Sequence, residues 1–324
     1  MIGVHRLASC VKGGLWLVRG AGLRGQVERL EHQLAALTGQ FGQLQARVIQ
    51  TADQANFTAT YLRSRAVVRG HRMYLDPTDN VVSPTLLAHG IFEPLETELV
   101  EREVRPGDVV LDIGANVGYY TLIFAERVGE SGHVFAFEPD PDNFALLEKN
   151  VRANRYPNVT LERKAVSDVT GRIKLYTCPD NKGDHRIYDS GDGRRSLDID
   201  AVTLDDYFAG YKGGIDFIKM DTQGAEAGIL RGMTGLLRQH DGIKIVTEFW
   251  PVGLRRFGAS AEQFLNDLSQ LGFRWTVIDE GAKDFYPASI SQLLQTYVPE
   301  KENFTNLFCV RGSAMRAEKV PTRP

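Results

Sequence analysis

A glycine-rich turn between two apolar runs constrains the fold of this chain more than any other feature of its sequence. Residues 109–113 (VVLDI) form a short apolar run, as expected of a strand buried on both faces of a sheet. The turn GANVG follows at 114–118, and the next apolar residues have the spacing of a helix that Gly129 can end. A second apolar run, 133–137, ends in Glu138. This order of strand, turn, helix and strand predicts a parallel α/β sheet.

The turn is expected to carry a binding site, because ligands of open parallel sheets lie beyond the carboxyl ends of the strands. Gly114 lets the backbone approach a ligand closely, and the turn leads into the N-terminus of a helix. Glu138 ends the second strand, where a carboxylate can accept hydrogen bonds from both hydroxyls of a ribose. The pattern predicts a site for a nucleoside-containing cofactor.

The residues of the turn favour S-adenosylmethionine over a dinucleotide. In the dinucleotide fingerprint G-x-G-x-x-G the second glycine makes room for a pyrophosphate, and here Asn116 occupies that position. Tyr119 and Tyr120 also crowd the start of the helix. Asp112 places a negative charge before the turn, which repels a pyrophosphate and suits a ligand with an ammonium and a sulfonium group. A dehydrogenase that binds NAD is therefore a distant alternative.

Composition limits the classes of partner and compartment. The formal net charge of the 324 residues is −3, so bulk electrostatics give no case for nucleic-acid binding. Three cysteines without paired spacing indicate a reducing compartment, and we predict a cytoplasmic protein. No apolar run approaches the roughly 20 residues that span a bilayer. Residues 1–22 form a basic leader, for which a peripheral contact with a membrane surface stays open.

A heptad pattern precedes the glycine turn. From Leu23 to Val48 the apolar residues recur at alternating steps of four and three, so we predict a coiled-coil helix over 23–65. Such a narrow apolar stripe cannot be buried by one helix alone. We therefore expect a homo-oligomer formed through residues 23–55. The alternatives are docking of this helix to a partner or onto the domain, and a single surface helix. At the other end of the chain, residues 313–324 are expected to be a flexible tail.

Residues 66–107 are predicted to be a connector and lid. Residues 73–75 and 81–82 could pair as a hairpin around an Asp- and Asn-rich turn. A helix is expected to start near Pro94, a favoured residue in the first turn, and such a helix can lie over the mouth of the cofactor site. The residues that could line this mouth are His89, Phe92 and Glu93.

Residues 108–312 continue as alternating strands and helices. Helices are expected over 141–154 and 260–271, and an inserted β structure over 171–203. The insertion contains a polar loop, 178–196, of the kind that often contacts substrates. The strands predicted for the main sheet are 109–113, 133–137, 159–161, 215–220, 243–250, 273–278 and 306–310.

Several polar residues near the predicted strand ends are candidates for the site. Asn143 follows Glu138 closely enough to reach the cofactor. Ser167 and Asp168 could lie beside the adenine, or could only form a turn. His185 lies in the polar loop; it could take part in catalysis, although a loop histidine is more often solvated.

These motifs together resemble a known family. The segments LDIGANVGYYT, FAFEPDPDNFALLEKNV, AVSD, VTLDDY and FIKMDTQGAEAGILRGM occur in this order and resemble the FkbM family of S-adenosylmethionine-dependent methyltransferases. The resemblance covers roughly residues 85–310, outside the heptad region. It implies a class I methyltransferase, Rossmann-like seven-stranded sheet with one antiparallel strand. It also implies methyl transfer to an oxygen, typically a hydroxyl of a sugar, glycan or natural product.

The resemblance also assigns roles by position. The resemblance implies three acidic residues near the reacting centre: Asp221, Glu226 and Glu248. This sequence departs from the family at Gln223, where the family frequently has glutamate. Towards the cofactor it implies that Asp112, Gly114, Asn116 and Gly118 hold the methionine end, that Glu138 binds the ribose, and that Ser167 and Asp168 border the adenine.

Methyl transfer to a hydroxyl predicts a base near the reacting oxygen. The strand that ends at Asp221 should neighbour the strand with the glycine turn, and Glu248 should lie one strand further. We expect Asp221 to be the base or to orient the hydroxyl, with His185 as the second candidate. The alternative for Asp221 is that it only caps the next helix.

Two other functions fit parts of the sequence. A metal-assisted methyltransferase would use Asp221, Glu226 and Glu248 as oxygen ligands, although no metal site is predicted from the residue spacing. A non-catalytic scaffold could instead use the coiled-coil helix to recruit a complex that assembles glycans.

Overall fold

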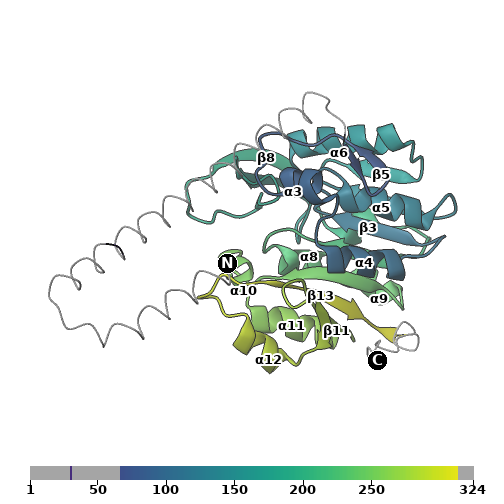
Figure 1. The fold of residues 1–324 in the computed structure, drawn as a ribbon. Coiled ribbons are helices and arrows are strands. Elements are labelled where there is room, and N and C mark those ends of the chain that lie inside the picture. The colour runs from purple at the N-terminus through teal and green to yellow at the C-terminus, as the bar shows by residue number, and fades with distance from the viewer. Residues whose placement is uncertain (1–29, 31–65, 313–324) are drawn as a thin grey trace, which may run out of the picture. The chain divides into compact units, whose positions relative to one another are not determined.

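The computed structural model describes residue 30 and residues 66–312. The predicted leader and tail, and the predicted coiled-coil helix apart from residue 30, lie outside the described residues. The chain divides into two compact units, 1–59 and 60–324. The fold described below belongs to the second unit (Figure 1).

One large mixed sheet forms the centre of this unit, with the strand order β12-β11-β13-β10-β9-β3-β4-β5. The five strands from β10 to β5 in this order run parallel, whereas β13 is antiparallel to both of its neighbours and β12 is antiparallel to β11. The strands are β3 (Val109–Ile113), β4 (His133–Phe137), β5 (Val159–Glu162), β9 (Phe217–Met220), β10 (Lys244–Phe249), β11 (Arg274–Asp279), β12 (Asp284–Pro287) and β13 (Thr305–Val310).

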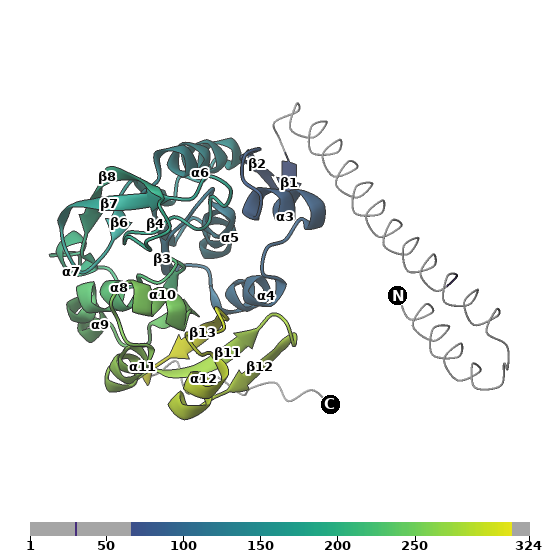
Figure 2. The ribbon, with the colours of Figure 1, turned by 90° about the vertical axis from the view of Figure 1, so that its left-hand side faces the viewer.

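The predicted number of strands was therefore too low. All seven predicted strands are present in the sheet, but β12 adds an eighth strand and a second antiparallel one. This strand has only four residues, ends in Pro287 and lies at the sheet edge, paired with β11 through a tight connection. So short and half-exposed a strand has no apolar run that would mark it in the sequence. Figure 2 shows β11, β12 and β13 grouped with α11 and α12 at one end of the domain.

Helices cover both faces of the sheet because successive strand residues face opposite sides. Val110 of β3 and Phe217 of β9 belong to the core that includes α4, α5 and α6, whereas Leu111 and Ile218 belong to the core that includes α8, α9 and α11. The helices are α3 (Val82–His89), α4 (Pro94–Glu103), α5 (Tyr119–Val128), α6 (Pro141–Asn154), α7 (Leu204–Tyr207), α8 (Glu226–Gly232), α9 (Thr234–Gln239), α10 (Pro251–Arg256), α11 (Ala261–Gln270) and α12 (Ile290–Thr296).

The inserted β structure is confirmed as a separate three-stranded sheet with the order β6-β8-β7. Its strands are β6 (Ala165–Val166), β7 (Gly171–Thr177) and β8 (Arg195–Val202). The polar loop between β7 and β8, residues 178–194, is called the strap below. Tyr176 and Arg186 form a β-bridge that joins the strap to the end of β7.

The predicted hairpin between residues 73–75 and 81–82 is wrong. The hairpin is formed instead by β1 (Ala66–Val68) and β2 (His71–Met73), whose turn residues Arg69 and Gly70 both have positive φ. Val82 begins helix α3 instead, and the carboxylate of Asp79 accepts hydrogen bonds from the backbone N–H groups of Val81 at 3.1 Å and of Ser83, in the first turn, at 2.6 Å. By contrast, the predicted start of a helix at Pro94 is confirmed.

The connector is attached to the domain by two asparagines of α6. The fully buried Asn150 donates hydrogen bonds to the carbonyls of Tyr74 and Val117 at 3.0 and 2.7 Å and accepts one from the N–H of Tyr74 at 2.6 Å. One turn later, Asn154 makes the same pair of backbone bonds to Arg72, at an exposed position.

We predict that Asn150→Ala lowers the free energy of unfolding by about 3 kcal/mol, because it removes three hydrogen bonds between a fully buried side chain and the backbone of Tyr74 and Val117. Asn154→Ala is the matched control and should cost less than about 1 kcal/mol, because water can replace its bonds. Urea unfolding of both variants measures this difference. Equal losses would contradict the role assigned to Asn150.

Candidate active site

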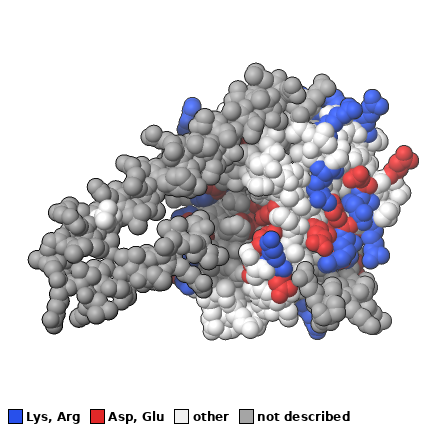
Figure 3. All heavy atoms as spheres, viewed as in Figure 1, with Lys and Arg blue, Asp and Glu red and all other residues white. Residues whose placement is uncertain are grey.

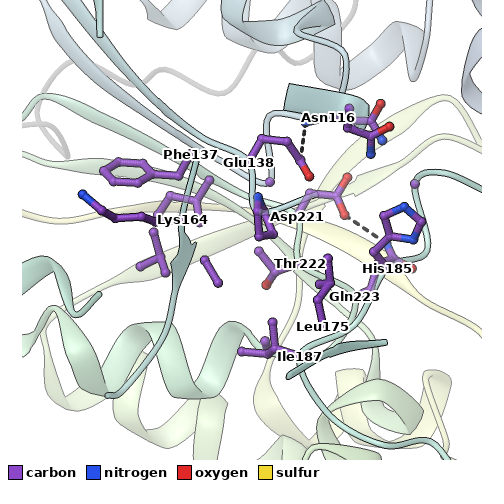
Figure 4. A pocket seen from close by; sticks show the side chains of 18 of the residues that line it. Asn116, Phe137, Glu138, Lys164, Leu175, His185, Ile187, Asp221, Thr222 and Gln223 are labelled. Carbon is purple, nitrogen blue, oxygen red and sulfur yellow. Dashed lines mark hydrogen bonds between the residues drawn. The ribbon is translucent and has the colours of Figure 1, made fainter. Parts of the chain in front are cut away.

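Two cavities that share part of their lining lie at the carboxyl ends of the parallel strands. The first has a volume of about 60 Å³ and is called the Glu138 cavity; the second has a volume of about 400 Å³ and is called the Trp250 cavity. Figure 4 shows the Glu138 cavity, with Asp221 pointing into it. The residues common to both cavities are Gly114, Asn116, Gly183, Asp221 and Gln223.

The cavities meet where β3 and β9 end side by side. The two strands pair in parallel with Ile113 opposite Met220, and the N–H of Asp221 donates to the carbonyl of Ile113 at 3.1 Å. Gly114 has φ +82°, and a Cβ at this position would overlap the carbonyl oxygen of Asp221. Only glycine therefore allows the turn after β3 to approach the end of β9 this closely.

Glu138 forms the polar wall of the first cavity. Its two carboxylate oxygens accept hydrogen bonds from the backbone N–H groups of Asn116 at 2.8 Å and Asp140 at 2.9 Å. Burial raises the pKa of Glu138 to about 8, even though these two bonds favour the ionised form. Apolar side chains form another part of the lining, including Phe137, Leu175 and Ile187 (Figure 4).

The strap closes the Glu138 cavity from one side. The carbonyl of Lys182 accepts hydrogen bonds from the side-chain amides of Asn116 at 3.0 Å and Asn143 at 2.9 Å. His185 is buried rather than solvated, and its Nδ1 accepts a hydrogen bond from the N–H of Cys178 at 3.0 Å. Burial lowers the pKa of His185. This residue lines the Glu138 cavity but not the Trp250 cavity.

Two buried polar atoms of this cavity have no hydrogen-bond partner among the described residues: Oδ1 of Asn143 and Nε2 of His185. Nε2 of His185 lies 3.7 Å from Oδ2 of Asp140, beyond hydrogen-bond distance. A buried polar atom without a partner is costly, so both atoms could gain from a ligand with donors and acceptors. The carboxylate of Glu138, the apolar side chains and these two polar atoms together match the chemical groups of a nucleoside.

A buried lysine lies among carboxylates in the Trp250 cavity. Nζ of Lys219 is 3.5 Å from Oε1 of Glu96 and 3.5 Å from Oδ2 of Asp221, and it lies 4.4 Å from the ring centre of Tyr120. Burial opposes its charge, but the carboxylates of Glu96 and Asp221 outweigh burial and raise the pKa of Lys219 above its usual value. Asp112 lines the same cavity and accepts a hydrogen bond from the hydroxyl of Thr121 at 2.5 Å.

Asp221 does not cap the helix that follows it. Its Oδ1 accepts a hydrogen bond from Nε2 of Gln223 at 3.0 Å, and its side chain is 32% exposed. Helix α8 begins at Glu226 and has Ala225 at its N-cap, without a side-chain hydrogen bond there. The predicted order of neighbours is confirmed, because β9 lies between β3 and β10, and Glu248 is the second-last residue of β10.

Glu226 has a structural position. It lines neither cavity and accepts hydrogen bonds from the N–H and the hydroxyl of Thr222 at 2.9 and 2.8 Å, which fixes the turn after Asp221. Residues 66–312 contain no group of three His, Cys, Asp or Glu side chains placed to hold a metal ion. Asp221, Glu226 and Glu248 thus do not come together as a ligand set in this structure.

Three of the predicted site residues line neither cavity. Gly118 stands at the N-cap of α5, where a Cβ would press against Leu147 of α6. Asp168 forms a 2.7 Å ion pair with Arg231, and Ser167 donates to Asp168 at 3.2 Å. The assignment of these two residues to the adenine has no support in this geometry.

Sequence reasoning missed several residues that line the cavities. Trp250 could have been found, since it follows Glu248 by two positions in extended backbone and so faces the same side. Lys182 and Arg186 could not, because no periodicity in the strap tells which of its polar residues turn inwards. Glu93 was noted only as a candidate for the mouth, and it lines the Trp250 cavity.

Comparison with known proteins identifies the family. The family model described as methyltransferase FkbM domain matches residues 112–275, which contain the glycine turn, Glu138 and Asp221. The chain belongs to the FkbM methyltransferase family. A second model, protein-L-isoaspartate(D-aspartate) O-methyltransferase, matches residues 45–168. In the FkbM family the cofactor is S-adenosylmethionine, as the glycine turn and Glu138 predicted.

Three characterised relatives match parts of this FkbM-family chain. Hexuronic acid methyltransferase AglP of Haloferax volcanii is 30% identical over 43% of this chain and 56% of its own length. The 31-O-demethyl-FK506 methyltransferase FkbM of Streptomyces tacrolimicus is 41% identical over 24% of this chain and 29% of its own. The 2-O-methyltransferase NoeI of Sinorhizobium fredii is 31% identical over 45% of this chain and 67% of its own. The chain thus spans about half of the first relative and less than a third of the second.

A solved methyltransferase FkbM from Methylobacillus flagellatus aligns with 69% of this chain and 53% of its own at 17% identity, with a TM-score of 0.39. Within the part of the chain that the structure describes, no helix has both the length and the apolar character to cross a bilayer. In the view of Figure 3, basic and acidic side chains are interspersed on the described part of the surface.

The close approach at Gly114 predicts a large effect of a small substitution. Gly114→Ala should lower the free energy of unfolding by about 3 kcal/mol or more. The new Cβ would overlap the carbonyl oxygen of Asp221, and alanine would also have to adopt the left-handed backbone conformation of Gly114. Gly258→Ala is the matched control: φ is +91° with open space around it, so the loss should be about 1 kcal/mol. Thermal and urea unfolding of both variants measure the two losses, and similar values would contradict the proposed contact.

The raised pKa of Glu138 predicts a pH-dependent affinity for S-adenosylmethionine. The folded-state pKa of about 8 lies above the ordinary value, so the carboxyl is mainly protonated at pH 6.5 and ionised at pH 9. Ribose hydroxyls donate best to the ionised form, so the affinity should rise with pH through about 8 and binding at pH 7 should release protons. Calorimetry between pH 6.5 and 9 tests this, with Glu138→Gln as the variant that should bind weakly at every pH. A flat profile for the unsubstituted protein would contradict the role of Glu138.

Proposed function

We propose that this protein transfers a methyl group from S-adenosylmethionine to a hydroxyl oxygen of a sugar, glycan or natural product. The observation that carries the proposal is the position of Asp221. Its carboxylate lines both a cavity fitted for a nucleoside and a larger cavity with room for an acceptor. A group at this position can act on an acceptor placed next to the cofactor.

The residues around the Glu138 cavity fit S-adenosylmethionine. In our proposal Glu138 binds the ribose, and Asn143 and His185 contact the adenosine. The turn from Gly114 to Asn116 contacts the part of the cofactor that leads to its methionine end. Asp112 borders the Trp250 cavity near the turn, where its carboxylate suits a cationic ligand. When bound, the cofactor supplies an electrophilic methyl group on a sulfonium.

The protein's own contribution is to position the acceptor and to accept its proton. A hydroxyl is a weak nucleophile until a base within hydrogen-bond reach takes its proton, and we assign this role to Asp221. Lys219 stabilises negative charge on Asp221 at 3.5 Å and holds the carboxylate beside β3. We do not assign His185 as the base, because it lines the Glu138 cavity and not the Trp250 cavity.

The relatives support an oxygen acceptor. The names of the haloarchaeal and rhizobial proteins describe a hexuronic acid methyltransferase and a 2-O-methyltransferase, and both relatives share about 30% of their aligned residues with this chain. We further infer self-association through residues 23–55 and a cytoplasmic location. Both inferences depend on sequence outside the described residues and on composition.

Replacing Asp221 tests the proposal most simply. Asp221→Asn keeps the shape of the side chain but removes the base, so kcat should fall by a factor of about 10² to 10⁴ while the affinity for S-adenosylmethionine changes little. Asp241→Asn changes an exposed acid in the turn before β10 and should leave both values unchanged. Turnover can be measured with labelled cofactor and a panel of glycosides.

Unchanged turnover of Asp221→Asn, with intact cofactor binding, would remove Asp221 from the mechanism. If the unsubstituted protein does not bind S-adenosylmethionine in calorimetry, the methyltransferase proposal fails and the non-catalytic scaffold becomes the better account.

A further inference from the structure

Successive residues of the strap alternate between the two cavities. His185 and Ile187 line the Glu138 cavity but not the Trp250 cavity. Asp184 and Arg186 line the Trp250 cavity but not the Glu138 cavity. The β-bridge between Arg186 and Tyr176 makes the backbone extended here, and successive side chains of extended backbone face opposite sides. A movement of this part of the strap therefore changes both cavities at once.

On the side of the Trp250 cavity, the strap contacts residues that follow β9 and β10. The guanidinium of Arg186 lies 5.0 Å from the ring centre of Trp250, the residue directly after β10. It also donates to both carboxylate oxygens of Asp184, at 2.8 and 3.0 Å, which fixes its orientation. The hydroxyl of Tyr188 donates to the carbonyl of Gln223, in the turn after β9, at 2.7 Å. The strap thus supplies part of the wall around the ring of Trp250.

On the side of the Glu138 cavity, neighbouring groups fix the polarity of the two atoms that have no hydrogen-bond partner within residues 66–312. Nδ2 of Asn143 donates to the carbonyl of Lys182 at 2.9 Å, so its buried Oδ1 is the acceptor that remains. Nδ1 of His185 accepts from the N–H of Cys178 at 3.0 Å, so the neutral ring carries its proton on Nε2. The cavity therefore offers one acceptor from α6 and one donor from the strap.

A hydroxyl of a nucleoside matches this pair. It can donate to Oδ1 of Asn143 and accept from Nε2–H of His185 at the same time. Asn143 belongs to the body of the domain and His185 to the strap, so such a ligand connects the two. It makes both bonds only when the strap lies as it does here. Because a ligand shifts an equilibrium towards the state that it binds better, the cofactor favours this closed position of the strap.

We propose that His185 is a positioning residue that links the cofactor to the acceptor cavity. By binding the nucleoside it draws the strap closed, and the closed strap places Arg186 against Trp250 and completes the wall of the Trp250 cavity. S-adenosylmethionine therefore binds before the acceptor. The inference rests on the proposed function and adds to it an order of binding.

The test uses the full chain labelled with fluorotryptophan, which gives one fluorine NMR signal for each of its three tryptophans. Trp250→Phe assigns the signal of Trp250. Saturation with S-adenosylhomocysteine should shift this signal by more than its line width, because the ring gains the contact with Arg186. The signal of Trp275 is the internal control and should not move, because the N–H of Trp275 donates to the carbonyl of Ala288 at 2.9 Å, in another part of the domain.

Two substitutions separate the contact with the ligand from the contact inside the strap. His185→Asn keeps an acceptor for the N–H of Cys178 but is too short to reach the ligand. It should bind S-adenosylhomocysteine about five- to tenfold more weakly and, at saturation, leave the Trp250 signal in place. His185→Gln keeps a donor at the position of Nε2 and should retain at least about half of the shift. His133→Asn is the matched control, because Nε2 of His133 lies 2.8 Å from the hydroxyl of Thr160, and it should behave as the unsubstituted protein.

Arg186→Met tests the second half of the link. It removes the guanidinium from the ring of Trp250, so saturation with S-adenosylhomocysteine should no longer shift the signal. An unmoved Trp250 signal in the unsubstituted protein at saturation would overturn the inference. So would a full shift in His185→Asn or in Arg186→Met, because the ligand would then act on Trp250 without the strap. If calorimetry shows that the unsubstituted protein does not bind S-adenosylhomocysteine, it is the proposed function that fails.

Discussion

The site depends on a close approach of backbone to backbone at the ends of β3 and β9. Gly114 has no side chain, so the turn that follows β3 can lie against the carbonyl of Asp221. A second approach of this kind occurs nearby, where Gly224 lies against the backbone of Gly253 and Gly253 leaves room for the ring of Trp250. These glycines set the distances among Asp221, Glu248 and Trp250. Any side chain at Gly114 or Gly253 would separate elements that must meet for the cavities to join.

Electrostatics then divides the site into two regions. In the Glu138 cavity, Glu138 is buried and is held by two backbone N–H groups, which fixes its direction but leaves lone pairs for a ligand. In the Trp250 cavity, Lys219 is the centre of a group of acids and carries a charge that burial alone would remove. A buried cation surrounded by carboxylates is costly to assemble, so this group is weak evidence for a gain in stability.

Much of this arrangement could be predicted from the sequence because it depends on buried strands and the residues that end them. Apolar runs marked all seven strands that were predicted, and the strand ends gave Asp112, Glu138, Asp221 and Glu248 as candidates. The strand β12 was missed because four half-exposed residues ending in proline form no apolar run. The β1–β2 hairpin was missed because its turn needs a positive φ at Arg69, a residue type that does not indicate such a turn.

The inner surface of the cavities was less predictable. The strap has no periodicity, so its sequence cannot tell that Arg186 faces Trp250 or that the carbonyl of Lys182 holds two asparagines. Asp168 was predicted either to border the adenine or to form a turn, and its ion pair with Arg231, from a distant part of the chain, could not be predicted from either pattern. Contacts between residues far apart in sequence decide these positions, and no local pattern records them.

The most direct test of this account is a crystal structure of the protein with S-adenosylhomocysteine. The account predicts that the ribose hydroxyls lie within hydrogen-bond distance of Glu138, with the adenine under the strap and the sulfur facing Asp221 at the border of the Trp250 cavity. A ligand bound outside the Glu138 cavity, or bound there with its sulfur directed away from Asp221, would contradict the account.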